Sequence, residues 1–313
     1  GGALRVGPRS AVAVPGPAAF GRVGAQPTVT DAHVVLGHIT ETALSGGVTL
    51  DPSAAERAVG SLAHALGAEP ARVARAMIDI ADASVARALR RVSVERGVDP
   101  RECVLVPFGG GGPLHCCGLA EQLGMRTIFV PPHAGVLSAL GLAITAERRE
   151  RMISVLALAA EMDRGVVRRE MERAAMGVVA GSSWRREWIA RARYVGQGHE
   201  LDLPVRDGDD GAALAARFTT LHEQRNGFTL DAAVEVIGMR HLASGPSHPV
   251  RLARRGDSEW SEATRVDDGG TFTARLAGPS VVVLPGATLR IAPGWIGEPH
   301  ETGGWLLQRG VVA

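Results

Sequence analysis

The residues with the clearest chemical potential are four consecutive glycines, Gly109–Gly112, in the run VLVPFGGGGPLHCCGLAEQLG. An apolar segment precedes them and an amphipathic one follows, which predicts a strand, a glycine-rich turn and a helix. Glycine leaves no side chain between backbone and ligand, and successive N–H groups at a helix N-terminus suit an anion. We therefore predict a phosphate-type binding site, the alternative being a tight turn without ligand. Its residues would be Gly109, Gly110, Gly111, Gly112 and Pro113.

Two common nucleotide motifs do not fit this loop. The dinucleotide fingerprint needs a third glycine where Leu114 or His115 stands. The Walker phosphate loop needs a lysine followed by serine or threonine, and residues 104–124 contain none of these. Because an unperturbed imidazole titrates near pH ~6.5, we predict that His115 contacts the ligand or handles a proton as a catalytic residue. A hydrogen-bonded packing role is the alternative.

Composition excludes several classes of partner. The chain has 34 basic and 33 acidic residues, so charge gives no reason to expect binding to nucleic acid or to an anionic membrane. No apolar run approaches the ~20 residues of a membrane span. The three cysteines, Cys103, Cys116 and Cys117, form neither a disulfide framework nor a C-x₂-C zinc pair. They fit a reducing compartment, so we expect a cytoplasmic protein.

The elements that would position the loop follow an α/β alternation in the first half of the chain. Proline and glycine punctuate residues 7–30 too often for a helix, so this stretch should be a loop. Asp51 before Pro52 predicts a helix that ends at Gly67. The remaining elements expected here are a helix over 71–96, a strand over 126–130 and a small-residue helix over 134–146.

The sequence changes character near residue 148, and we expect a domain boundary there, giving domains 1–150 and 151–313. Alternating apolar and charged residues predict strands over 188–194 and 201–205. The other expected elements are helices over 163–179 and 212–225, a strand over 234–242, a loop over 246–270 and a small terminal β module.

Several segments together resemble a known family in order and spacing. They are GPRSAVAVPGPAAFGRVGAQPTVTDAHVVLG, ARALRRVSVERGVDPRE, VPFGGGGPLHCCGLAEQLG and VPPHAGVLSALGLAITAERR, with RYVGQGHEL and GPSVVVLPGATLRIAPGW further on. This combination is similar to the hydantoinase A/5-oxoprolinase family. That family includes ATP-dependent oxoprolinases, N-methylhydantoinases and related lactamases, and the nucleotide-binding subunits of acetone and acetophenone carboxylases.

The resemblance implies a fold of the α/β class. Residues 1–150 would be the second ribonuclease-H-like lobe of an ATPase fold like that of actin, sugar kinases and heat-shock chaperones. A smaller, β-rich α+β domain would follow. The glycine turn would then be a nucleotide-binding motif, and the helix over 134–146 would pack across the lobe interface. Since the chain begins just upstream of the GPRSA segment, we expect the first lobe to be missing and the isolated fragment to be inactive.

The resemblance also implies an activity. ATP, with a divalent cation such as Mg²⁺ or Mn²⁺, would phosphorylate the carbonyl of a lactam or hydantoin before hydrolysis. A hydantoinase B-type partner subunit is implied as well. Two alternatives stay open: a nucleotide-binding subunit of a ketone carboxylase, and an inactive half-enzyme.

The resemblance directs attention to the TVTDAH segment. Asp31 is the candidate to contact metal-bound water or substrate, as a catalytic residue and as a metal ligand. Thr28 and Thr30 would donate hydrogen bonds to substrate, together with His33, which stands where the family usually has asparagine. The alternative is a turn whose hydroxyl and carboxylate groups cap the local backbone.

Overall fold

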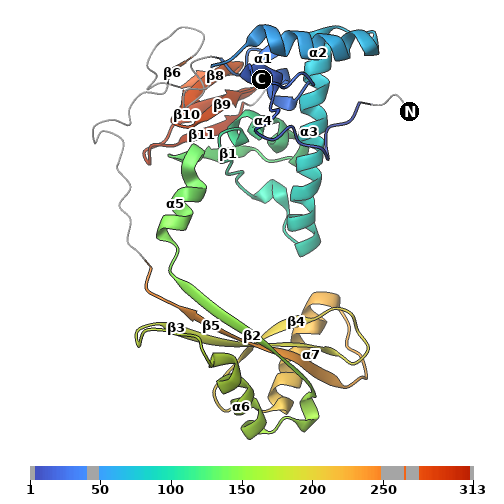
Figure 1. Cartoon of the computed structure of the whole chain (residues 1–313), viewed down its shortest axis with the longest axis vertical. Helices are drawn as coiled ribbons and strands as arrows, with labels where there is room; N and C mark the ends of the chain where they lie inside the picture. The colour runs from blue at the N-terminus through green and yellow to red at the C-terminus, as the bar shows by residue number, and fades with distance from the viewer. Residues whose placement is uncertain (1–3, 41–48, 248–263, 266–274, 311–313) are drawn as a thin grey trace. The chain divides into compact units, whose positions relative to one another are not determined.

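The computed structural model describes residues 4–40, 49–247, 264–265 and 275–310. The chain divides into two compact units, Gly1–Gly141 with Arg251–Ala313, and Leu142–Val250 (Figure 1). Within the described residues, no helix combines the length and apolar character needed to cross a membrane.

Three helices form one side of the first unit: α1 (Val29–Val35), α2 (Pro52–Leu66) and α3 (Pro70–Ser93). The predicted start of α2 is confirmed, because the Asp51 carboxylate accepts the Ala54 N–H at 2.9 Å. The helices pack through a shared core of small and branched residues, namely Ala32, Val59, Ala63, Val73, Ala74, Met77 and Ile78. Helix α1 therefore rests on α2 and α3.

The rest of the first unit places α4 (Gly112–Leu123) against two small antiparallel sheets. One sheet has the order β1-β11-β10-β7, with β1 (Thr127–Val130), β7 (Leu276–Ala277), β10 (Trp295–Pro299) and β11 (Trp305–Arg309). The other joins β6 (Thr264–Arg265), β8 (Ser280–Leu284) and β9 (Ala287–Ile291). Figure 1 shows the red C-terminal strands beside β1.

The pairing of β1 with β11 changes the expected division of the chain. We expected residues 151–313 to form one C-terminal domain, but the described C-terminal strands close the core of the first unit. Val130 pairs with Trp305, and both side chains are buried in the core that also contains Cys116 and Leu123. The C-terminal β module is present, but it is not separate from the glycine-turn region.

The segment before the glycines is extended over only a short distance. We expected a strand over 104–108, but Leu105 alone pairs, in a parallel bridge with Ile128. The Leu105 N–H donates to the Thr127 carbonyl at 3.1 Å, and the Phe129 N–H donates to the Leu105 carbonyl at 2.8 Å. Pro107 has no N–H to donate, so the ladder cannot continue toward the turn.

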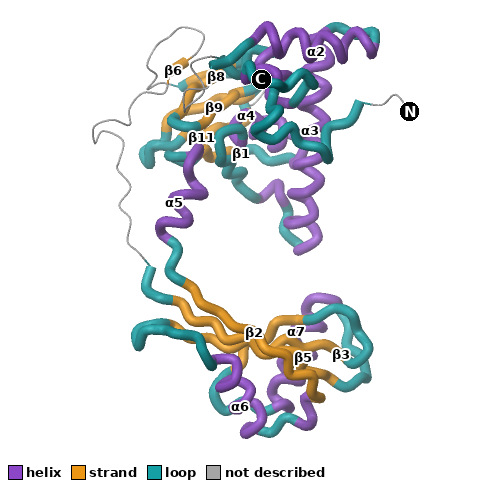
Figure 2. Tube along the Cα trace, in the orientation of Figure 1, coloured by secondary structure: helices purple, strands orange, loops and turns teal. Residues whose placement is uncertain are grey.

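The second unit contains a four-stranded antiparallel sheet with the order β2-β5-β3-β4. Its strands are β2 (Arg148–Leu158), β3 (Arg185–Tyr194), β4 (Leu201–Val205) and β5 (Val234–Ser244). Helices α6 (Arg164–Ala175) and α7 (Gly211–Asn226) pack on the face that carries Ala190, Tyr194 and Leu203. Figure 2 shows strands of this sheet in orange, with helices α6 and α7 in purple. The alternation predicted for β3 and β4 is confirmed, and most of the predicted 246–270 loop lies outside the described residues. Helix α5 (Leu137–Ile144) precedes β2 and has no buried residue.

Candidate functional site

The glycine turn is fixed by hydrogen bonds on both sides. Gly109 has φ +82°, a left-handed conformation that favours glycine, and its N–H donates to the Ala134 carbonyl at 2.7 Å. The Gly110 carbonyl accepts the Thr288 N–H at 3.2 Å. The turn thus holds the start of α4 against β9 and the segment after β1.

The N-terminus of α4 has donors to offer a ligand. The N–H groups of Gly110, Gly111 and Gly112 have no acceptor among the described residues, and no side chain caps the helix. Three unpaired amides at the positive end of a 12-residue helix suit an anion. A Cβ at Gly111 would meet nothing within 4 Å, so space lies beside these amides. The residues present therefore fit a phosphate group.

His115, in the first turn of α4, is held by a buried carboxylate. Its Nδ1 lies 2.6 Å from Oδ1 of Asp82, which comes from α3 and is 4% exposed. Gly118 makes room for this carboxylate, because a Cβ there would lie 2.3 Å from Asp82 Oδ2. A carboxylate accepts only, so the neutral form of His115 carries its proton on Nδ1 and has Nε2 as an acceptor.

Two more imidazoles extend this contact. His33 Nε2 lies 3.4 Å from His115 Nε2, with the rings edge to face at an interplanar angle of 86°. His33 Nδ1 lies 3.1 Å from His38 Nδ1. The structure therefore joins the predicted residues His33 and His115 and adds His38 and Asp82. We refer to these four side chains as the histidine chain.

Asp82 and His38 were not predicted as site residues. One signal was present in the sequence: Asp82 stands four residues after Ile78 and four before Ala86, both buried on the same face of α3. A charged residue in a buried helical stripe indicates a polar partner inside the protein. His38 carried no comparable signal, because it follows Gly37 just beyond α1.

The surroundings of His33 and His38 favour neutral rings. Burial, followed by the charges of His115, His38 and Arg290, lowers the pKa of His33 to about 2. Burial, followed by the charges of Arg290 and Arg75, lowers the pKa of His38 to about 4. At neutral pH both rings are therefore uncharged, with one N–H and one acceptor nitrogen each.

Asp31 and Thr28 lie in the same unit but act on the local backbone. The Asp31 carboxylate is fully buried and accepts the N–H groups of Ala19 at 2.7 Å and Thr28 at 2.8 Å. It also accepts the Thr28 hydroxyl at 2.7 Å and, more weakly, the Ala18 N–H at 3.4 Å. The Asp31 N–H in turn donates to the Thr28 hydroxyl, which completes a capping box at the start of α1. The geometry corresponds to the capping alternative.

The other predicted contacts are less defined. Thr30 is half-buried in the first turn of α1 and makes no hydrogen bond through its side chain among the described residues. In the described part of the chain, no three or more His, Cys, Asp or Glu side chains are placed to hold a metal ion. Asp31, with its oxygens already engaged, does not fit the role of a metal ligand.

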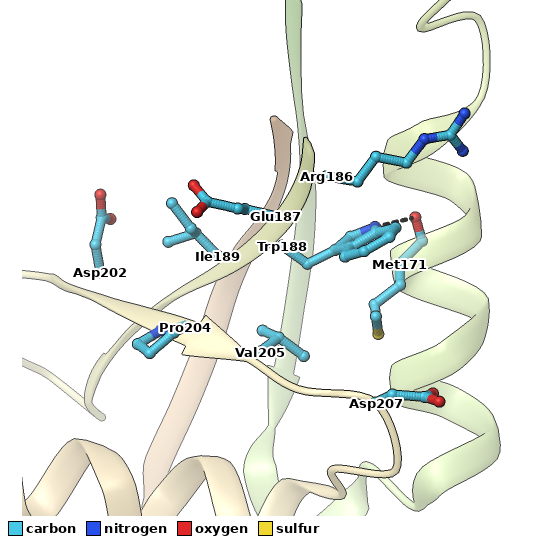
Figure 3. Close-up of a pocket in the computed structure, with 9 residues that line it drawn as sticks. All are labelled: Met171, Arg186, Glu187, Trp188, Ile189, Asp202, Pro204, Val205 and Asp207. Carbon is cyan, nitrogen blue, oxygen red and sulfur yellow. Dashed lines mark hydrogen bonds between the residues drawn. The ribbon is translucent and has the colours of Figure 1, made fainter. Parts of the chain in front are cut away.

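The second unit has a cavity of about 670 Å³ beside β3 and β4 (Figure 3). Trp188 forms a fixed wall, because its indole N–H donates to the Met171 carbonyl at 3.2 Å. Figure 3 shows Glu187 and Trp188 on opposite sides of β3. Asp202 is paired with Arg191 and Arg240. The carboxylates around this cavity therefore do not converge on one point, and we place the candidate site on the histidine chain and the N-terminus of α4.

Comparison with solved structures identifies the class of fold. The ATP-dependent caprolactamase from Pseudomonas jessenii superposes with a TM-score of 0.70 at 25% identity, covering 97% of this chain and 50% of that one. The fold is thus of the caprolactamase class. Residues 1–151 match the hydantoinase/oxoprolinase family model, and the chain belongs to that family.

Curated relatives agree with this assignment. An uncharacterised protein from Methanocaldococcus jannaschii is 37% identical over 245 residues, covering 77% of this chain and 36% of its own length. Caprolactamase subunit alpha of Pseudomonas jessenii is 33% identical over 241 residues, covering 71% of this chain and 34% of its own length. Acetophenone carboxylase gamma subunit of Aromatoleum aromaticum is 41% identical over 143 residues, which are 45% of this chain and 19% of that subunit. The chain thus spans about a third or less of these relatives.

Proposed function

We propose that this chain is part of an ATP-dependent enzyme that opens a cyclic amide. The observation that carries the proposal is the start of α4, where three amides without an acceptor among the described residues precede His115 by one turn. Asp82 holds that histidine in a defined orientation. The similarity to a caprolactamase subunit and the family match support the same class of reaction.

The chemistry explains why these groups would be needed. Resonance protects an amide carbonyl from water, and a phosphoryl group supplied by ATP would activate that carbonyl toward attack. The N–H groups of Gly110–Gly112 would hold phosphate oxygens through charge-assisted hydrogen bonds. Because Asp82 fixes the His115 proton on Nδ1, His115 would take up or release a proton through Nε2 when water attacks or the nitrogen leaves.

A divalent cation, Mg²⁺ or Mn²⁺, would be held chiefly by the phosphates. Asp31 already accepts hydrogen bonds from Ala19 and Thr28. Among the predicted substrate contacts, Thr30 has a free hydroxyl within the described residues, and His33 lies against His115. We retain both as candidates to contact the substrate. In the actin-like arrangement implied by the family resemblance, the glycine turn would form one wall of the ATP cleft.

A second candidate function is a nucleotide-binding subunit of a ketone carboxylase. The similarity to the acetophenone carboxylase subunit favours it, since those 143 aligned residues are 41% identical. Both functions would use an ATP-activated oxygen and a partner subunit, for which a hydantoinase B-type protein is our candidate. They differ in the co-substrate, because a carboxylase needs a ketone and bicarbonate.

The deciding experiment measures ATP hydrolysis by the full-length protein with its natural partner subunit. We expect stimulation by a panel of lactams and hydantoins that includes caprolactam and 5-oxoproline. Stimulation by acetone or acetophenone with bicarbonate, but not by cyclic amides, would establish the carboxylase function instead. If neither class stimulates hydrolysis, the inactive half-enzyme becomes the supported alternative.

A matched pair of variants at Gly111 tests the anion site. Gly111 has φ −100° and open space around it, so Gly111→Glu and Gly111→Gln should both fold. The carboxylate of Gly111→Glu would oppose a bound phosphate, and we expect nucleotide affinity to fall roughly tenfold, or about 1.4 kcal/mol. Gly111→Gln should change it much less. Equal losses in titration calorimetry would show that bulk, not charge, is responsible.

A further inference from the structure

The contacts of the histidine chain fix the direction of its hydrogen bonds. Asp82 accepts from His115 Nδ1, so a neutral His115 has an unprotonated Nε2. That nitrogen can only accept from His33 Nε2–H, which leaves His33 Nδ1 as an acceptor. His33 Nδ1 must then accept from His38 Nδ1–H. For neutral rings, this single arrangement gives every contact one donor and one acceptor.

We propose that His38, His33 and His115 form a proton relay that ends on Asp82 and loads or unloads His115 during the proposed amide-hydrolysing reaction. This inference rests on the proposed function for its purpose, while the relay itself rests on the contacts alone. His38 is half-buried at the end of the chain, and its Nε2 has no hydrogen-bond partner among the described residues. It is the entry point for a proton from solvent.

The transfer is balanced in atoms and charge. A proton binds His38 Nε2, the His38 Nδ1–H bond breaks as His33 Nδ1–H forms, and the His33 Nε2–H bond breaks as His115 Nε2–H forms. One proton has entered, and one positive charge has moved to the His115 imidazolium, where it faces the Asp82 carboxylate. Running backward, the same shifts return a proton from His115 to solvent.

The surroundings explain why the positive charge should not remain on His33, the middle histidine. The charges of Arg290 in β9 and Arg75 in α3 oppose a positive charge on His33 and His38, and among the described residues the only carboxylate hydrogen-bonded to the three histidines is Asp82, at the far end. Burial lowers the pKa of His33 to about 2, so His33 passes a proton without holding it. His33 and His38 are therefore positioning residues in this proposal.

The first test reads the tautomers directly. In the full chain with ¹⁵N-labelled histidine, long-range nitrogen–proton spectra at pH 7 should show Nδ1–H for His115 and His38 and Nε2–H for His33. Assignments come from through-bond correlations in the wild-type chain. A His33 ring that carries Nδ1–H beside a neutral His115 would overturn the relay, because two bare nitrogens would then face each other at 3.4 Å. This readout decides the proposal even if a variant fails to fold.

The second test interrupts the relay. His33→Phe keeps a ring in the same space but has no nitrogen, and we expect protonation and deprotonation of His115 Nε2, measured by ¹⁵N relaxation dispersion, to be at least tenfold slower. His64→Phe, on the exposed face of α2, should leave this rate unchanged. An unchanged rate in His33→Phe would overturn the relay. So would equimolar Zn²⁺ shifting His33 and His115 Nε2 together, since the pair would then be a metal site. Neither readout uses substrate, so failure of the proposed activity remains distinguishable.

Discussion

At the scale of single residues, His33 makes the stability of the fold depend on pH. Its folded-state pKa is about 2, below the ordinary value of 6.5 that the unfolded chain would have. Between these two values the unfolded chain binds a proton and the folded chain does not. The stability contributed by the neutral ring is therefore complete above pH 6.5 and is lost progressively as pH falls below it.

This loss of stability at low pH can be measured as the dependence of the unfolding free energy on pH. Between pH 6.5 and 4.5, we expect His33 to steepen the fall in unfolding free energy by up to roughly 1.4 kcal/mol per pH unit. His33→Phe should flatten the profile in urea titrations, whereas His64→Phe should not. Parallel profiles for wild type and His33→Phe would mean that His33 accepts a proton in the folded state near neutral pH.

Asp31 offers a second test at this scale, between capping and metal binding. Asp31→Ala leaves the buried Ala19 N–H and the Thr28 N–H without their acceptor. We expect the unfolding free energy to drop by about 3 kcal/mol, while EDTA leaves the melting temperature of the wild type unchanged. If EDTA lowers that melting temperature and Asp31→Ala abolishes the effect, the metal-ligand prediction is restored.

The site was predictable from the sequence only where its signal is local. The glycine turn and His115 follow each other directly, so their chemistry could be inferred from one segment. The contact of His33 with His115 joins residues 82 positions apart, and that of Asp82 with His115 joins residues 33 apart. Such contacts depend on how α1, α3 and α4 pack, which residue spacing along one helix does not encode.

At the scale of elements, the crossing of α3 and α4 depends on Gly118. A methyl group there would lie 2.3 Å from Asp82 Oδ2, so Gly118→Ala should displace the carboxylate and cost roughly 1–3 kcal/mol. Asp82→Ala in the same chain should recover much of that loss. The matched control is Gly60→Ala in α2, where a Cβ meets nothing within 4 Å and stability should rise by about 0.5–1 kcal/mol.

Thermal unfolding of these variants distinguishes packing from helix propensity. A stabilised Gly118→Ala protein would show that the two helices can separate without loss, contrary to their observed contact. We expect Gly118→Ala to lower the melting temperature and Gly60→Ala to raise it.

Helices with sequence-encoded ends were predicted well, and strands without alternation were not. Asp51 and Gly67 bound α2 as predicted. The predicted helix over 71–96 is an α-helix to Ser93, and a 3₁₀ turn at Val94–Arg96 continues it to Gly97. Strand β2 was missed because it begins with the charged run Arg148–Arg151, which is exposed. Its hydrogen bonds with β5 make this segment a strand, although its residue pattern does not predict one.

At the scale of the whole molecule, the second unit has a core of its own. Its buried residues come from β3, β4, β5, α6 and α7 and from the segment between β2 and α6. We therefore expect residues 142–250 to fold alone, with a cooperative urea transition and dispersed amide resonances. Residues 1–141 alone should not, because β1 would lack its partner β11. Non-cooperative melting of residues 142–250 would contradict this division.

The expected boundary near residue 150 lies close to where the second unit begins. We did not predict, however, that the strands after residue 275 would belong to the first unit. Short apolar runs after residue 275 predict strands but not their neighbours. The partner of β11 precedes the whole second unit in the sequence, and only the shared core around Trp295, Trp305 and Leu307 reveals it.

The ends of the second unit meet in one ladder, since Arg148 pairs with Ser244 and the Gly245 N–H donates to the Glu147 carbonyl at 2.8 Å. The chain therefore enters and leaves this unit at adjacent points. Tension transmitted along the polypeptide from either side would load the β2–β5 ladder at this end, one hydrogen-bonded pair at a time. The second unit should peel open like a zipper under low force, whereas a strand pulled lengthwise would resist through all of its bonds at once.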